Sequence, residues 1–415
     1  MSLNERRRLE VMSLVRDKQL PLTRGASLLK LSVRQVRRLW KDYQARGDVG
    51  LIHGLRGKPS NHSKRPSFKQ QVLERYASCY ADFGPTLAAE HLSEDGLQVR
   101  RETLWRWLLK AGLWSRRQRR AVHRSRRERR SCLGEMVQMD GSHHDWFEGR
   151  GGRCILMVMI DDATSRTWAR FFEGETTRAA MEVFGSYVRK YGLPHSLYVD
   201  RDSIYRSDRQ ATVEEELRGQ PAPATQFARA MAQLNVALIL ANSPQAKGRV
   251  ERMNGTLQDR LVKQMRLQGI DNIASGNLFL EKRFLPALNR KFTVAAKNAL
   301  DVHRSMPAGV KLQEVLSFQE ERRVSNDWCV RWRSRIFQLD RRHEALGLAG
   351  RELTVREKLD GSIDLLSQGH ALHWKELKER PMPARSKPTI QNNRPWKPAV
   401  AHPWNRRPPE PAGRV

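Results

Sequence analysis

The pattern of hydrophobic and polar residues predicts three short helices between Glu5 and about Tyr43. Apolar residues recur there every three or four positions, which is the spacing of a buried helical face. Ser32 precedes the third helix and Gln35 follows three residues later, the arrangement of a capping box. The face that this third helix buries is predicted to consist of Val33, Val36, Leu39, Trp40 and Tyr43.

The opposite face of the third helix is basic. It carries Arg34, Arg37, Arg38 and Lys41. A helix-turn-helix domain lays such a helix in the major groove, where basic side chains meet phosphates and base edges. We therefore predict a helix-turn-helix DNA-binding domain over residues 1–48 and a basic, glycine-rich linker over residues 49–65. A solvated charged face without a ligand is the alternative interpretation.

A second helical unit is predicted over residues 66–115. Helical spacing extends from Phe68 to Tyr80, Pro85 stands near the start of the next helix, and a third helix runs from Arg101 to Leu113. The residues of this last helix expected to face inward are Leu104, Trp105, Leu108 and Leu109. We interpret the unit as a second helix-turn-helix domain, with Arg101 and Arg106 as candidate DNA contacts. A subdomain that only packs is the alternative.

An arginine-rich segment separates the helical units from the centre of the chain. Nine of the fifteen residues between Arg116 and Arg130 are Arg. Such a segment cannot fold on itself without neutralisation, so we expect it to be disordered, or helical only along DNA. We predict a linker over residues 116–133.

The central segment, residues 134–268, has a different periodicity. A continuous apolar run at 154–160 and a second run at 167–172 predict paired strands beside the strand that leads to Asp140. A helix, a strand, a helix, a strand and a last helix follow. This order predicts an α/β domain with a mixed sheet.

The last third of the chain changes pattern again. A helical connector is predicted over residues 269–318, and alternating hydrophobic and polar residues over 319–376 predict a small β-barrel, with Asp360-Gly361 as a hairpin turn. Nine of the nineteen prolines lie beyond residue 380, so residues 377–415 are predicted to be a disordered tail. The chain is thus predicted to be multidomain, with all-α modules, an α/β core and a β-domain.

Charge indicates the class of partner. The chain has 76 Lys and Arg against 45 Asp and Glu, a formal net charge of +31. A surface with this charge attracts polyanions, and nucleic acid is the leading candidate. The longest apolar runs, 154–160 and 236–241, are too short to cross a bilayer, and no apolar stretch follows the basic amino terminus. We expect no membrane partner and a cytoplasmic, nucleoid-associated protein.

The four cysteines form no C-x-x-C pair. We expect them to be reduced and structural, with no structural zinc site.

Three carboxylates are the candidate chemical groups. Asp140 and Asp200 end apolar strand-like runs, and Glu251 opens a helix. Carboxylate oxygens suit hard divalent cations, and in a chain this basic the fitting substrate is a phosphodiester. Without metal the carboxylates repel, by about 4 kcal/mol for a pair at ~4 Å and an effective dielectric of ~20. We therefore expect the site to be incomplete until metal binds.

The motifs around these carboxylates resemble the integrase core of DDE transposases. The segments are Gln138-Met139-Asp140-Gly141, Tyr198-Val199-Asp200-Arg201 and, most specifically, Asn242-Ser-Pro-Gln-Ala-Lys-Gly-Arg-Val-Glu251-Arg-Met-Asn-Gly-Thr-Leu257. The layout over residues 1 to about 375 is similar to bacterial insertion-sequence transposases of the ISNCY group, related to retroviral integrases and Mu transposase. The resemblance implies a ribonuclease H-like core. It also implies that Asp140, Asp200 and Glu251 are the catalytic, metal-binding triad.

The resemblance also implies the activity. Such an enzyme uses Mg²⁺, for which Mn²⁺ can substitute, to cleave at the terminal inverted repeats of a mobile element and to join the freed 3′-hydroxyls to target DNA. Its partners would be double-stranded DNA and further copies of the chain, as a dimer or larger assembly. A nuclease without strand transfer and a transposase-derived DNA-binding regulator are the alternatives.

Two departures from the related proteins stand out. The interval of 51 positions from Asp200 to Glu251 is long, which we interpret as a surface insertion at 206–224. The chain also lacks the zinc-binding domain with which retroviral integrases begin.

Residues near the three carboxylates in sequence are predicted to contact DNA, to lie in the core or to cap a turn. Lys247 precedes Glu251 by four residues, so it shares that helical face and can contact DNA phosphate. Further candidate DNA contacts are Arg252, Asn254 and Gln258, whereas Val250, Met253, Leu257 and Leu261 are expected in the core. Asp161 and Asp162 are predicted to cap a turn. His143 and His144 should point to opposite faces of a strand, and so not share one ion.

Overall fold

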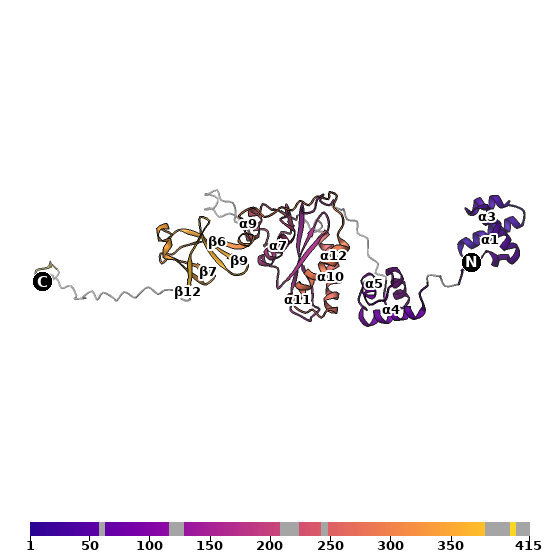
Figure 1. Ribbon diagram of the computed structural model, residues 1–415, viewed down its shortest axis with the longest axis horizontal. Helices are drawn as coiled ribbons and strands as arrows, with labels where there is room; N and C mark the ends of the chain where they lie inside the picture. The colour runs from indigo at the N-terminus through magenta and orange to yellow at the C-terminus, as the bar shows by residue number, and fades with distance from the viewer. Residues whose placement is uncertain (58–62, 116–127, 208–223, 242–247, 378–398, 404–415) are drawn as a thin grey trace, which may run out of the picture. The chain divides into compact units, whose positions relative to one another are not determined.

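Two units, residues 1–122 and 123–415, divide the chain in the computed structural model (Figure 1). The structure describes residues 1–57, 63–115, 128–207, 224–241, 248–377 and 399–403. Several predictions fall outside these residues: most of the arginine-rich linker, most of the insertion at 206–224, Lys247 and most of the carboxyl-terminal tail.

The first three helices form as predicted. They are α1 (Leu3–Arg16), α2 (Leu22–Leu29) and α3 (Val33–Arg46), followed by the 3-10 turn η1 (Gly47–Leu51). The capping box is present: the Ser32 hydroxyl accepts from the Gln35 backbone N–H at 3.2 Å, and Gln35 Oε1 accepts from the Ser32 N–H at 3.3 Å. In the predicted stripe of α3, Val36 and Tyr43 are buried, and Val33, Leu39 and Trp40 are half-buried against the same small core.

The second helical group consists of α4 (Pro66–Cys79), α5 (Pro85–Glu94) and α6 (Arg101–Lys110). Pro85 opens α5, where its missing N–H costs no helical hydrogen bond. In α6 the buried residues are Leu104 and Leu108, as predicted, but Trp105 and Leu109 are only half-buried. Trp107 packs against this core, because the stripe of α6 runs through 104, 107 and 108.

The centre of the second unit is a five-stranded mixed sheet. Its strands are β1 (Met136–His143), β2 (Ile155–Asp161), β3 (Thr167–Phe172), β4 (Ser196–Val199) and β5 (Ala237–Leu240), in the spatial order β3-β2-β1-β4-β5. The first three pair antiparallel, whereas β4 runs parallel to both β1 and β5. The predicted α/β domain with a mixed sheet is confirmed.

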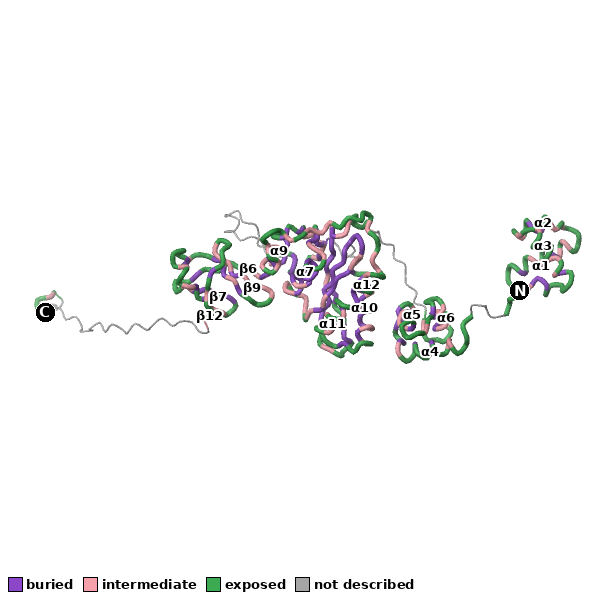
Figure 2. The backbone as a smooth tube through the Cα atoms, viewed as in Figure 1, coloured by how far each residue is buried: buried purple, intermediate pink, exposed green. Residues whose placement is uncertain are grey.

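Helices cover both faces of this sheet, and its central strands are buried (Figures 1 and 2). One face is covered by α7 (Thr177–Tyr191) and α9 (Gln226–Gln233). The other is covered by α10 (Gly248–Leu267), α11 (Ile273–Phe279) and α12 (Leu285–Phe292). A π-helical turn, η3 (Leu280–Phe284), joins α11 to α12.

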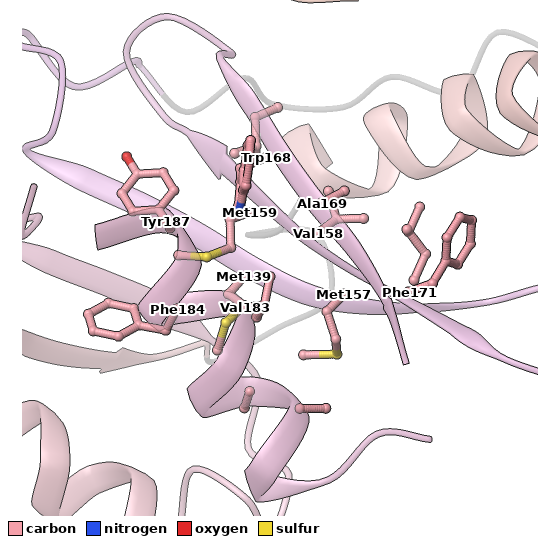
Figure 3. Packing of buried hydrophobic residues seen from close by; sticks show 14 of the residues in the cluster. Met139, Met157, Val158, Met159, Trp168, Ala169, Phe171, Val183, Phe184 and Tyr187 are labelled. Carbon is pink, nitrogen blue, oxygen red and sulfur yellow. The ribbon is translucent and has the colours of Figure 1, made fainter. Parts of the chain in front are cut away.

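Alternation along the strands assigns each residue to one of these faces. Met159 is paired with Trp168, whose indole N–H donates to Ser186 of α7 at 2.8 Å, so this pair faces α7 (Figure 3). Val158, one residue earlier, faces the opposite layer. Because Asp140 is the partner of Val158 across β1 and β2, Asp140 also lies on the face covered by α10.

The last part of the second unit contains two antiparallel sheets around one core. A short helix, α13 (Leu312–Val315), leads into them, and η4 (Arg341–Leu346) lies between β8 and β9. The strands are β6 (Ser317–Arg323), β7 (Cys329–Trp332), β8 (Arg335–Leu339), β9 (Glu352–Lys358), β10 (Ile363–Ser367), β11 (His370–Leu372) and β12 (Trp374–Leu377). Their order is β11-β10-β9-β6 in one sheet and β12-β8-β7 in the other.

The sequence predicts these strands correctly, but not whether they close into a barrel. Val330 and Trp332 are buried as expected, and Asp360-Gly361 connects the paired strands β9 and β10. The predicted barrel is not found, because the described strands form two separate sheets. Alternation shows that one strand face is buried, but it does not determine whether a sheet closes on itself.

Among the described helices, none is long and apolar enough to cross a membrane. All four cysteines, Cys79, Cys132, Cys154 and Cys329, are free thiols.

Candidate active site

Asp140 lies within β1, and Asp200 directly follows the end of β4, the neighbouring parallel strand. In the register between β1 and β4, Gln138 is the partner of Tyr198. Asp140 and Asp200 each lie two residues further along, so continuing this register sets them side by side on the same face of the sheet. Because adjacent strands are about 4.8 Å apart, the two carboxylates are neighbours where β4 ends.

The electrostatics of nearby side chains support this placement and add a third carboxylate, Glu175. The pKa of Glu175 is raised, chiefly by burial and further by the negative charges of Asp200 and Asp140, while a hydrogen bond with His143 opposes the rise. Burial also raises the pKa of Tyr205 well above its ordinary value, and the charges of the same three carboxylates add to this effect. Asp140, Asp200 and Glu175 therefore lie close enough for their charges to interact.

The close approach of Glu175 explains the glycine after Asp140. Glu175 directly precedes Thr176, the residue that caps the start of α7. A Cβ atom at Gly141 would lie 2.5 Å from the Glu175 carboxylate, so any larger residue there would displace it. Sequence reasoning does not identify Glu175. The available signal is Gly141 itself, because a glycine inside a strand often marks such a close approach.

Three hydrogen bonds join helix α10 to β1, and we call this set of contacts the polar ladder. Gln138 Oε1 accepts weakly from the Val250 backbone N–H at 3.4 Å. Asn254 Nδ2 donates to Asp140 Oδ2 at 3.1 Å, and Gln258 Nε2 donates to the Ser142 hydroxyl at 3.2 Å.

The contacts of the polar ladder are evenly matched because four residues of a helix rise about 6 Å and two residues of a strand about 6.6 Å. Each turn of the helix therefore meets every second residue of the strand. Asn254 and Gln258, the candidate DNA contacts, both bond to β1 here, and their contact with DNA stays a prediction. Helical spacing shows which residues share a face, but not whether that face meets protein or ligand.

Glu251 lies in the first turn of α10 and is exposed. It precedes Asn254 by three residues, which places it about 60° around the helix from the side chain bonded to Asp140. The expected core residues of the same helix are buried, namely Val250, Met253, Leu257 and Leu261.

The donor chemistry of these side chains fits a hard divalent cation. Asp140 and Asp200 offer neighbouring carboxylates, and Glu251 is carried by the helix that bonds to Asp140. Among the described residues, no three His, Cys, Asp or Glu side chains are yet close enough together to hold an ion. A third ligand from Glu251 would require its exposed side chain to turn toward the two aspartates.

The adjacent aspartates at the end of β2 have different roles. Asp161 accepts from the Thr164 N–H at 2.8 Å, which confirms the predicted turn cap. The same prediction needs correction for Asp162, which is wholly buried. Its carboxylate accepts from Gln138 Nε2 at 2.7 Å and from Arg249 Nη1 at 2.5 Å, so it bonds to β1 and α10 instead of to its own turn.

The adjacent histidines make separate contacts, although only His143 lies in β1 and His144 follows its end. His143 Nε2 lies 3.0 Å from a Glu175 oxygen. The His144 ring packs edge-on against Trp146, at 5.4 Å between ring centroids.

The candidate DNA contacts of the first unit are exposed. These residues are Arg34, Arg37, Arg38 and Lys41 on α3, and Arg101 and Arg106 on α6. Arg101 pairs with Glu102, and Arg106 Nε donates to the Glu102 carbonyl at 3.3 Å. Their roles in DNA binding remain predictions.

Comparison with known proteins gives one matching family and two full-length relatives. The family described as "Helix-turn-helix domain" matches residues 7–60. "Putative transposase y4bF" of Sinorhizobium fredii (strain NBRC 101917 / NGR234) is 41% identical over 379 residues, which cover 90% of this chain and 81% of the relative. "Transposase for insertion sequence IS1202" of Streptococcus pneumoniae is 26% identical over 447 aligned positions, covering 97% and 93% of the two chains.

Solved structures show weaker likeness. A chain of the simian T-cell lymphotropic virus intasome, in complex with PP2A regulatory subunit B56 gamma, has a TM-score of 0.31 and 16% identity, covering 58% of this chain and 72% of the other. The HTLV-2 integrase catalytic core domain in complex with magnesium (trimeric form) has a TM-score of 0.28 and 15% identity, covering 36% and 85%. Likeness at these TM-scores supports no statement about this chain.

Proposed function

The chain belongs to the family of bacterial insertion-sequence transposases, and from this premise we propose that it cleaves and joins the DNA ends of a mobile element. It binds the terminal inverted repeats, frees 3′-hydroxyls there and joins them to target DNA. The observation that supports this most is that Asp140 lies in β1 and Asp200 at the end of the parallel strand β4, beside the helix that carries Glu251.

The residues proposed to hold divalent cations are Asp140, Asp200 and Glu251, with Mg²⁺ as the ion and Mn²⁺ as a substitute. When bound, a pair of such ions would neutralise charge on the attacking and leaving oxygens of the phosphodiester. The surrounding residues orient the ligands. Asn254 fixes the Asp140 carboxylate by donating to Oδ2, and His143 holds Glu175 at the edge of the site.

The chemistry consists of two displacements at phosphorus. In the first, a water oxygen attacks the phosphodiester at the element's end, and the bond from phosphorus to the 3′-oxygen breaks, which leaves a 3′-hydroxyl. In the second, this hydroxyl loses its proton and attacks a target phosphodiester, from which a target 3′-oxygen departs. Because one phosphodiester replaces another, the joining step needs neither ATP nor a covalent enzyme intermediate.

The first unit is proposed to select the DNA. The exposed basic face of α3 would lie in a major groove of the inverted repeat, and the second helical group would read neighbouring base pairs through Arg101 and Arg106. Two ends must be held together for transposition, so the active form is proposed to be a dimer or larger assembly on DNA.

A joining assay tests the proposal. It combines the full chain, Mg²⁺, labelled inverted-repeat ends and a plasmid target, and it compares the wild type with Asp140→Asn, Asp200→Asn and Glu251→Gln. Each substitution should lower joining by about 100-fold or more, because each removes a charged ligand, while end binding stays close to wild type. Asp259→Asn is the control, since Asp259 is an exposed acid further along α10.

Three results would contradict the proposal in different ways. Full joining by one of the variants would remove that residue from the site. Cleaved ends without joined products in the wild type would indicate a nuclease. A shifted band without any cleavage would indicate a DNA-binding regulator.

A further inference from the structure

The end of β2 holds a buried carboxylate that the proposed chemistry does not use. Asp162 is 0% exposed. It accepts hydrogen bonds from three segments: the Arg130 backbone N–H at 2.8 Å, Gln138 Nε2 of β1 at 2.7 Å and Arg249 Nη1 of α10 at 2.5 Å. A buried carboxylate remains charged only when such donors surround it, so the three segments are held at one point.

Arg249 brings this network to the helix that carries Glu251. It is the second described residue of α10, and its side chain is only 11% exposed where it meets Asp162. Glu251 follows two residues later, within the same helical turn. Any shift of the Arg249 backbone therefore moves Glu251 as well.

Gln138 links the network to the other half of the site. While its Nε2 donates to Asp162, its Oε1 accepts from the Val250 N–H of α10. Asp140 follows two residues later in β1 and lies on the same face. One side chain thus connects the strand of Asp140 with the helical turn of Glu251.

We propose that the buried ion pair between Asp162 and Arg249 is a positioning pair, which fixes the first turn of α10 against β1 and so sets the place of Glu251. This inference rests on the proposed role of Glu251 as a ligand. Neither Asp162 nor Arg249 touches the reacting atoms. Their role is to restrict the positions that Glu251 can occupy before it turns toward Asp140 and Asp200.

The chain supplies a matched control in the preceding residue. Asp161 is also buried, at 1% exposure, but it bonds to Thr164 and to the Gly134 N–H. Asp161→Asn and Asp162→Asn therefore each remove one buried negative charge from the end of the same strand. Only the second substitution removes the charged partner of α10.

The experiment uses the full chain and two measurements. Hydrogen exchange, followed by mass spectrometry without DNA or metal, reports the opening of α10. We expect Asp162→Asn to speed exchange of the amides of residues 252–254, which donate to the carbonyls of the first turn, by roughly ten-fold and to leave the last turns near wild type. The second measurement is the Mg²⁺ concentration for half-maximal joining, which should rise by roughly 10- to 100-fold at unchanged affinity for the DNA ends.

Further variants keep the test decisive if Asp162→Asn folds poorly. Arg249→Met keeps most of the side-chain volume and should reproduce both changes. Arg249→Lys retains a cation and should restore part of the wild-type metal dependence. Asp161→Asn should leave both measurements near wild type, even where it lowers the melting temperature.

Equal shifts in the Asp161 and Asp162 variants would overturn the positioning role, as would wild-type exchange of the amides of residues 252–254 in Asp162→Asn. The exchange measurement does not depend on catalysis. If the wild type joins no DNA, the proposed function fails while the exchange comparison still decides the role of the pair.

Discussion

At the scale of single residues, Gly141 shows how closely the site is packed. The residue lies between Asp140 and Ser142 of β1, and the Glu175 carboxylate occupies the space where a side chain would begin. Burial and the charges of Asp140 and Asp200 already raise the pKa of Glu175. The carboxylate is thus held close to like charges and directly against Gly141.

We predict that Gly141→Ala impairs catalysis more than folding. The new Cβ atom would lie 2.5 Å from Glu175 Oε2, so the Glu175 side chain must leave its place beside the two aspartates. Joining should fall by about 10- to 100-fold, as for other changes to residues that support a metal site. Joining and thermal unfolding of the full chain are the measurements.

Gly152→Ala is the control for Gly141→Ala, because no atom lies within 4 Å of a Cβ built there. Joining at the wild-type rate by Gly141→Ala would show that the position of Glu175 is irrelevant to the chemistry.

Residues of the candidate site differ in how well the sequence marks them. Asp140 and Asp200 can be chosen as candidates because each follows an apolar run, and Glu251 because of the specific string around it. Glu175 carries no such mark, since it reaches the site only through its tertiary contact with Gly141 of β1. Asp162 is misinterpreted for a related reason: a DD pair after a strand is typical of a turn, and only tertiary packing buries the second member.

At the scale of elements, most helices and strands follow from local patterns. Ser32 and Gln35 mark the start of α3, and the continuous apolar run at 154–160 marks β2, which is buried on both faces. The face by which α10 meets β1 cannot be predicted in the same way. Its contacts use Asn254 and Gln258, and polar residues on a helix usually indicate solvent.

The effect of pH on the start of α1 tests whether Glu5 anchors this helix. Glu5 accepts hydrogen bonds from the Ser2 and His53 backbone N–H groups and pairs with Arg56, so it ties α1 to the segment after η1. The pKa of Glu5 is lowered from 4.5 to about 2. The largest cause is the backbone hydrogen bond from Ser2, followed by that from His53 and by the charge of Arg56.

A folded-state pKa below the unfolded value stabilises the fold above the unfolded pKa. The contribution of Glu5 is therefore complete above a pH of about 4.5 and is lost as the pH falls toward about 2. Glu5→Gln should lose protection at neutral pH and show less further loss on acidification. Hydrogen exchange of α1 to α3, corrected for the intrinsic effect of pH, measures this. Identical pH profiles for the variant and the wild type would contradict the anchoring role.

At the scale of the whole molecule, the net charge of +31 governs how the chain meets DNA. Binding that neutralises 6 to 10 phosphates weakens by about 10³- to 10⁵-fold between 50 and 200 mM salt. The exposed basic face of α3 is the leading source of such contacts in the first unit. The sequence predicts this face, but it does not show which of these side chains read bases.

We predict that Arg38→Ala lowers the slope of log affinity against log salt by about one, if Arg38 contacts a phosphate. Affinity should fall for specific and nonspecific DNA alike. Arg16→Ala is the control, because Arg16 already pairs with Asp17 at 2.9 Å. Titrations of the full chain at several salt concentrations provide the slopes. An unchanged slope for Arg38→Ala would remove this residue from the interface.

The most direct measurement of the central claim is the position of bound manganese. Crystals of the full chain grown with Mn²⁺ give anomalous density that locates the ion independently of activity. The account predicts a peak coordinated by Asp140 and Asp200, at about 2.1 Å from oxygen, with Glu251 turned inward from its exposed position. Manganese bound elsewhere, or no peak beside these aspartates at saturating Mn²⁺, would contradict it.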